Sequence, residues 1–201
     1  MAVHALPQPS TSIERKIDKM FFAGTTTGDL DPTRNVRVAM CLWSARRRHD
    51  ILECYISRVT QMDPDRLLQH VRRIQCNPPF AKRTYAWDEF AKYRFALNLP
   101  GNTCAWSRLP EIMASRTTVM MHYRHPDMCW YYPAMQEGTH YVGFSSEFEL
   151  EHAYRSLSRD ARRCEFMTEA AHAFARSFVS SASAGLYTAA LLEEAAHLFA
   201  P

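Results

Sequence analysis

Glycine is scarce in this sequence, which has six among 201 residues. Long apolar runs are absent as well: nowhere do about 18 uncharged apolar residues follow one another, which excludes an encoded membrane-spanning helix. The first twelve residues, MAVHALPQPSTS, contain neither the charged nor the apolar segment of a signal peptide. We therefore expect no membrane span and no export signal, and the sequence leaves the compartment open.

The sequence also lacks a large excess of charge of either sign. The formal net charge is +3, which is too small to predict nucleic-acid binding, and the basic run at 46–49 is typical of a solvated helix end. No C-x-x-C pair occurs, and the cysteines are scattered among mostly apolar neighbours. We expect reduced core cysteines, with a secreted, disulfide-bonded form as the alternative. They are Cys41, Cys54, Cys76, Cys104, Cys129 and Cys164.

What is present is an alternation of short apolar runs with segments of helical period, after an arm over 1–12 that we expect to be flexible. This alternation predicts one Rossmann-like α/β domain over 13–201, a doubly wound parallel sheet with helices on both faces. The expected strands span 19–24, 51–56, 94–99, 117–122 and 140–144. The expected helices span 33–45, 63–74, 87–93 and 107–115.

The C-terminal part is expected to be helical throughout. A fifth helix begins at Ser146, which forms a capping box with Glu149. Two further helices follow over 160–199, separated by a break at 180–185. The i, i+4 spacing of four residues in the first of them predicts its apolar face. These residues are Phe166, Ala170, Phe174 and Phe178.

Three of the few glycines, Gly24, Gly28 and Gly101, follow expected strands. Doubly wound sheets bind ligands at the carboxyl ends of their strands, and a glycine there lets backbone N–H groups approach an anion. The hydroxyls of Thr25, Thr26 and Thr27 and the fork of Arg108 suit a diphosphate. On spacing alone, two tight turns and a surface arginine are the favoured explanation of the pattern.

Common catalytic motifs are missing. The stretch GTTTGD lacks the lysine of a P-loop, and neither G-x-G-x-x-G nor G-x-S-x-G occurs. Metal binding by His122, His125 and His140 is disfavoured because no carboxylate accompanies them on a clear helix. The aromatic residues at 130–132 are expected to be packing residues rather than ligand contacts.

Three segments in order resemble glycosyltransferase family 90, which includes protein O-glucosyltransferases and capsule-associated xylosyltransferases. They are KIDKMFFAGTTTGDLDPTRNVR, KYRFALNLPGNTCAWSRLPEIMAS and WYYPAMQEGTHYVGFSSEFEL. The resemblance implies the C-terminal, donor-binding half of a GT-B enzyme, which uses a UDP-sugar such as UDP-glucose or UDP-xylose without a metal or cofactor. The sugar would go to a hydroxyl of a protein or glycan acceptor, with a separate acceptor-binding domain as a possible partner.

By that resemblance, Gly24, Thr25, Thr26 and Thr27 would line the diphosphate or the sugar. Gly101, Ser107 and Arg108 would hold the UDP phosphates, and the cradle would stabilise charge on the leaving group.

The sequence departs from the family pattern at Ala23, where the family has arginine, and no residue is identified as the general base. Asp29 and Asp31 are better explained by a solvated turn. The alternative function is therefore a noncatalytic nucleotide-binding or scaffold domain that has lost the acceptor domain and the base. A helical interaction protein is a weaker third hypothesis.

Overall fold

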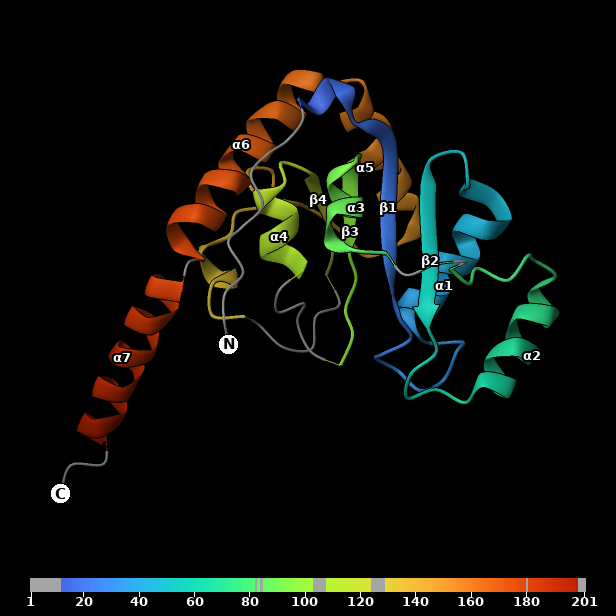
Figure 1. Ribbon diagram of the computed structural model, residues 1–201, viewed down its shortest axis with the longest axis horizontal. Helices are drawn as coiled ribbons and strands as arrows, with labels where there is room; N and C mark the ends of the chain where they lie inside the picture. The colour runs from blue at the N-terminus through green and yellow to red at the C-terminus, as the bar shows by residue number, and fades with distance from the viewer. Residues whose placement is uncertain are drawn as a thin grey trace.

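A five-stranded parallel sheet organises the molecule (Figure 1). The computed structural model describes residues 12–81, 83, 85–102, 108–123, 129–179 and 181–198. The strands lie in the order β2-β1-β3-β4-β5 and all neighbours run parallel. Their bounds are β1 (Ile17–Thr25), β2 (Leu52–Arg58), β3 (Tyr93–Asn98), β4 (Thr118–His122) and β5 (Val142–Phe144). The expected doubly wound α/β fold and all five strands are confirmed, which rules out a mostly helical protein.

Helices cover both faces of the sheet, so successive residues of a strand enter different cores. On β1, Met20 and Phe22 pack into one cluster with residues of α1, α2 and α5. Phe21 and Ala23 pack into the other with residues of α3, α4 and α6. Burial on both faces explains why the central strands read as continuous apolar runs rather than as alternating ones.

Seven α-helices are present in the described residues, and local sequence signals begin several of them. Asp63 caps α2 by accepting hydrogen bonds from the N–H groups of Asp65 and Arg66, and Pro64 occupies the first turn. The helices are α1 (Val36–Trp43), α2 (Pro64–Ile74), α3 (Trp87–Ala91), α4 (Arg108–Ala114), α5 (Glu147–Ser158), α6 (Ala161–Phe178) and α7 (Ser181–Leu198). Short turns of other helix types span Ile13–Arg15, Ser44–Arg48 and Tyr132–Ala134.

The expected start of α5 is confirmed, but the Glu149 side chain bonds to a different residue than a capping box predicts. Ser146 accepts from the N–H of Glu149, as a capping box requires. The Glu149 carboxylate, however, accepts from the N–H and the hydroxyl of Ser145 instead of returning to Ser146. No helix within the described ranges has the combination of length and apolar character that a membrane span needs.

The predicted apolar face of α6 is wrong. Phe166 is 59% exposed and Phe178 is 40% exposed, whereas Met167, Ala171 and Ala175 are buried against the body of the protein. Small alanines let α6 approach α4 closely, and bulky rings at those positions would hold the two helices apart. The break at 180–185 is also shorter than expected, because α7 already begins at Ser181. Figure 1 shows α7 running away from the sheet.

The aromatic residues at 130–132 are packing residues, as expected. Tyr131 and Tyr132 are buried in the second core cluster, and the Trp130 ring stacks on Phe178 and Tyr187. These rings therefore fill the junction between α6, α7 and the loop that precedes β5.

The expectation that every cysteine is reduced is wrong for Cys129, which is disulfide-bonded. Cys41, Cys54 and Cys164 are free and buried, and Cys76 is free and half-buried. Cys104 lies outside the described residues, as do nearly all of the arm at 1–12, His125 and Ser107.

A buried amine joins the beginning of β1 to the α4–β4 turn. The Lys16 Nζ donates to the carbonyl oxygen of Ser115 at 2.8 Å and to the Thr117 hydroxyl at 2.9 Å. Both acceptors are neutral oxygens rather than a carboxylate, and burial lowers the pKa of Lys16 from 10.5 to about 8. The charged form is therefore less stable in the folded protein than in the unfolded chain.

We expect the Lys16 amine to make stability rise with pH above about 8. Between pH 8 and 10.5 the unfolded chain holds the Lys16 proton and the folded protein releases it, so the free energy of unfolding increases with pH. Urea unfolding at mildly and strongly alkaline pH should show a gain of about 1 to 2 kcal/mol in the wild type relative to Lys16→Met. Equal pH dependence in the two proteins would contradict this expectation.

Candidate functional site

The candidate site lies where β1 and β3 separate at their carboxyl ends. The β1–β3 pairing ends at Phe21 and Ala96, whereas β1 stays paired with β2 as far as Thr25. The chain goes from β1 to β2 on one side and later returns to β3 on the other, so the direction of winding reverses here. In open α/β sheets this reversal is the usual ligand position. We call residues 24–28, Arg37, 99–102 and Arg108 the switch-point site.

Arg37, in the first turn of α1, bridges the two loops of the site. Its Nε donates to the carbonyl oxygen of Pro100 at 2.8 Å and its Nη2 to that of Leu99 at 3.3 Å. Its Nη1 donates to the carbonyl oxygen of Thr25 at 3.1 Å and to the Thr27 hydroxyl at 2.6 Å. Burial lowers the pKa of Arg37 to about 10, which leaves the group charged at neutral pH. The loops after β1 and β3 are thus held together by one cation.

Arg108 brings a second guanidinium to the same place. Its Cζ lies 4.9 Å from the centroid of the Phe22 ring, and the Cζ of Arg37 lies 5.8 Å from it. A Cβ atom at Gly24 would lie 3.2 Å from the Arg108 Nη2. Burial, with a smaller contribution from the nearby Arg37 charge, lowers the pKa of Arg108 to about 9. Two like charges over one aromatic ring raise the local positive potential, which favours an anionic ligand.

Gly101 is required by the close approach of the two loops. A Cβ atom there would lie 2.6 Å from the Arg37 Nη2 and 2.9 Å from the Thr27 hydroxyl oxygen. One residue later, the Asn102 side-chain oxygen accepts from the N–H of Gly28 at 2.9 Å. The missing side chain at position 101 therefore lets Arg37 reach both loops at once.

Asn35 shapes the loop between β1 and α1. Its side-chain oxygen accepts from the N–H of Val38 at 3.1 Å, which caps α1. Its side-chain nitrogen donates to the carbonyl oxygens of Thr26 at 3.1 Å and Asp29 at 2.8 Å. This buried amide keeps the loop closed around the start of the helix that carries Arg37.

The three threonines of the loop are used differently. The buried Thr26 hydroxyl donates to the carbonyl oxygen of Thr60 at 2.9 Å and accepts from the N–H of Thr60 at 2.8 Å. It therefore holds the loop against the end of β2. The hydroxyls of Thr25 and Thr27 are only 3.4 Å apart, and both residues are half-buried. The Thr27 hydroxyl also accepts from the Arg37 Nη1, so these two side chains lie beside that guanidinium.

The structure brings most of the expected site residues together and adds two. Gly24, Thr25, Thr27, Gly101 and Arg108 converge, whereas Thr26 turns to Thr60 and Ser107 lies outside the described residues. Sequence reasoning missed Asn35 and Arg37. An available signal was the string TRNVR, because Asn before an apolar helical segment is a good N-cap and places the following arginine in the first turn.

The carboxylates of the β1–α1 loop serve the loop itself. The Asp29 carboxylate pairs with the Arg34 Nε at 3.2 Å. The Asp31 carboxylate accepts from the N–H and hydroxyl of Thr33, and these hydrogen bonds lower the pKa of Asp31. Both acids therefore stabilise a solvated turn, and we assign neither of them as a general base.

Metal ligation by histidine finds no support among the described residues. No group of three or more His, Cys, Asp or Glu side chains there could hold an ion. His140 accepts from the N–H of Gln136 at 2.9 Å, and the His122 ring meets Phe144 edge-on at 5.1 Å. These two histidines have local structural contacts.

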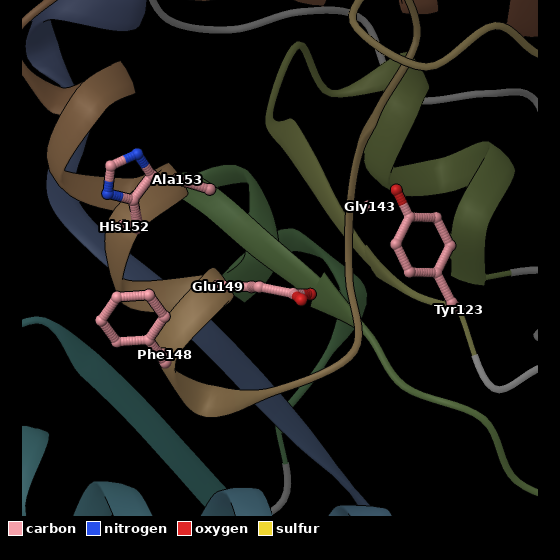
Figure 2. Close-up of a pocket in the computed structure, with 6 residues that line it drawn as sticks. All are labelled: Tyr123, Gly143, Phe148, Glu149, His152 and Ala153. Atoms are coloured by element: carbon pink, nitrogen blue, oxygen red, sulfur yellow. The ribbon is translucent and has the colours of Figure 1, made fainter.

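A second feature lies farther along the same edge of the sheet, after β4 and β5 (Figure 2). It is an open depression with a volume of about 370 Å³. The Tyr123 hydroxyl donates to the Glu137 carboxylate at 2.5 Å, and this hydrogen bond raises the pKa of Tyr123 to about 12. The Phe148 ring is 81% exposed at the rim. The lining residues are Tyr123, Gly143, Phe148, Glu149, His152 and Ala153.

Comparisons with known proteins agree with this architecture. Residues 42–200 match the model of a family described as Glycosyl transferase family 90. The chain is similar to the C-terminal domain of a glycosyl transferase group 1 family protein (LpcC) from Francisella tularensis, with a TM-score of 0.54 and 11% identity over 81% of this chain and 85% of that chain. At this identity the likeness shows the fold alone, that of a GT-B C-terminal domain.

A GtfA/B complex aligns with a TM-score of 0.47 and 11% identity over 84% of this chain and 36% of that chain. No curated protein matches the sequence. The family match includes Gly101 and Arg108 and begins after Arg37.

We expect Gly101→Ala to destabilise the protein by about 1 to 3 kcal/mol, the usual cost of overpacking. The new methyl group would displace the Arg37 guanidinium and break its hydrogen bonds to the loops. Gly185→Ala is the matched control, because nothing lies within 4 Å of its Cβ position in α7. The control should be neutral or more stable by up to about 1 kcal/mol in urea unfolding. Equal stability of Gly101→Ala and wild type would contradict the proposed close approach.

Proposed function

This chain belongs to glycosyltransferase family 90, and we propose that its switch-point site binds the diphosphate of a UDP-sugar donor. The convergence of two guanidiniums, Arg37 and Arg108, over the Phe22 ring carries this proposal. Gly24 and Gly101 keep the space around the guanidiniums free of side chains, and the hydroxyls of Thr25 and Thr27 supply neutral donors at the rim.

The cations have different tasks in this scheme. All three guanidinium nitrogens of Arg37 donate to loop atoms, so Arg37 positions the site and contributes its charge. Arg108 approaches Gly24 from α4 and would contact the phosphate oxygens, together with Ser107. Negative charge grows on the departing nucleoside diphosphate in the transition state, and fixed donors stabilise it by a few kcal/mol each. The protein would supply this charge itself, without a metal ion.

The depression after β4 and β5 offers a place for the nucleoside end of the donor. Because β3 and β4 are neighbours and parallel, the depression and the switch-point site open on the same edge of the sheet. Figure 2 shows the Glu149 carboxylate extending from α5 on the side of Tyr123. Exposed rings such as Phe148 suit a base, and carboxylates such as Glu149 accept from ribose hydroxyls.

The reaction that we propose is transfer of a sugar, such as glucose or xylose, from UDP to a hydroxyl of a protein or glycan. In this scheme the chain is the donor-binding half, and a separate domain provides the acceptor site and the general base. The engagement of Asp29 and Asp31 within their own loop supports this division. It also favours the alternative of a noncatalytic nucleotide-binding or scaffold domain.

We expect millimolar UDP to raise the melting temperature. A ligand at roughly 100 times its Kd stabilises the folded state by about 2.7 kcal/mol, which corresponds to roughly 5 to 10 °C in a chain of this length. Arg108→Met should lose most of this shift because it removes a charged phosphate contact. Arg159→Met, an exposed arginine at the end of α5, should keep it.

Equal shifts in Arg108→Met and Arg159→Met, or no shift in any of the proteins, would refute the site. Pyrophosphate should give a smaller shift than UDP, and Phe148→Ala should reduce the shift with UDP while leaving the shift with pyrophosphate unchanged. If Phe148→Ala leaves both shifts unchanged, the nucleoside does not occupy the depression.

Turnover separates the two functions. A glycosyltransferase domain should release UDP slowly from UDP-glucose or UDP-xylose by hydrolysis, and Arg108→Met should reduce that rate by tenfold or more, in line with the loss of one transition-state donor. The measurement is UDP release by the pure chain over many hours. UDP binding without any release of UDP, alone or with an added acceptor domain, would instead support the noncatalytic alternative.

A further inference from the structure

Two buried thiols face each other directly behind the switch-point site. The Sγ atoms of Cys41 in α1 and Cys54 in β2 are 3.2 Å apart. The two residues are 0% and 2% exposed, within the core cluster that contains Phe22. Cys54 pairs in register with Phe22, whose ring lies below both guanidiniums. The thiol pair is therefore the next layer of the protein beneath the candidate site.

The position of the pair is compatible with a covalent bond. A disulfide needs its sulfur atoms about 2.0 Å apart, so the two atoms must approach by roughly one ångström more. The elements that carry them, α1 and β2, already pack against each other.

We propose that Cys41 and Cys54 are a disulfide site that links α1 to β2. This inference does not depend on the proposed function. Cys129 is already disulfide-bonded, so this protein forms at least one disulfide. Cys164, by contrast, donates to the carbonyl oxygen of Leu157 and has no thiol partner in its contacts.

The reaction is thiol–disulfide exchange with a small disulfide such as oxidised glutathione. One cysteine loses its proton, attacks a sulfur of oxidised glutathione and releases one reduced glutathione, which leaves a mixed disulfide. The second cysteine loses its proton, attacks the protein sulfur of that mixed disulfide and releases the second reduced glutathione. The protein loses two hydrogens and two electrons, and oxidised glutathione takes up both.

The exchange should occur while the α1–β2 contact is open. In the folded protein both thiols are covered, and burial raises the pKa of Cys54, so little thiolate is available. The same burial protects the bond from reductants once it has formed. A metal site is not an alternative explanation, because no third ligand joins the pair among the described residues.

The bond would restrain the helix that positions the candidate site. Arg37 lies one helical turn before Cys41 on α1. Closing a loop between residues 41 and 54 removes freedom from the unfolded chain, and loops of this size raise the melting temperature by roughly 5 to 10 °C in a protein of this length.

The test counts thiols in the full chain. The protein is refolded with reduced and oxidised glutathione, quenched in acid, denatured and alkylated. We expect alkylation of only two cysteines, Cys76 and Cys164. Four cysteines would be alkylated if Cys41 and Cys54 stayed reduced. Tryptic digestion should yield the peptides 38–46 and 49–58 joined by a bond that dithiothreitol breaks.

Thermal unfolding provides the second readout. The oxidised protein should melt higher than a form in which only this pair has been reduced. Cys54→Ala should abolish the difference and Cys76→Ala should preserve it. Four alkylated cysteines after oxidative refolding, or a linked peptide that contains Cys76 or Cys164, would overturn the proposal. The thiol count on the unsubstituted chain decides the question even if Cys54→Ala does not fold.

Discussion

The bridge made by Arg37 is the constraint on which the candidate site depends. Where β1 and β3 separate, no ladder hydrogen bonds hold their ends, and two loops would otherwise be free to diverge. The Arg37 guanidinium supplies the missing connections to both loops, and Asn35 closes the first loop over the start of the same helix. A charge that is needed for structure is thereby delivered to the edge of the sheet where a ligand would bind.

Two of the few glycines lie at this site, where a side chain would crowd an arginine. Gly24 leaves space for Arg108, and Gly101 leaves space for Arg37, so two of the few glycines let two cations meet over Phe22. The cations repel each other, and burial together with this repulsion lowers the pKa of Arg108, whereas Cys54 and Glu111 act in the opposite direction. An anion would offset the repulsion between them, and for this reason we propose that this glycosyltransferase family 90 domain binds a diphosphate here.

The layers of the protein couple this site to the core. The Phe22 ring contacts both guanidiniums, and Phe22 pairs in register with Cys54 of the Cys41–Cys54 thiol pair. All of these groups belong to β1, β2, α1 or α4. A covalent link in the lower layer would therefore act on the helix that positions the upper one. Stability and the proposed ligand binding share the same small set of contacts in this part of the molecule.

Local patterns in the sequence were enough to determine the order of strands and helices and the start of α5 at Ser146. They also pointed to the segments with Gly24, Gly101 and Arg108. Hydrophobic period and turn chemistry act over a few residues, so a local pattern can report them. Only the tertiary structure decided which side chains meet. Arg37 bonds to Leu99 and Pro100, more than 60 residues away, and Thr26 turns to Thr60. The packing of α6 on α4 likewise selected its alanine face over its phenylalanine face. Such partners are distant in sequence, and no local preference specifies them; they become neighbours only when the parallel sheet brings its carboxyl ends to one edge.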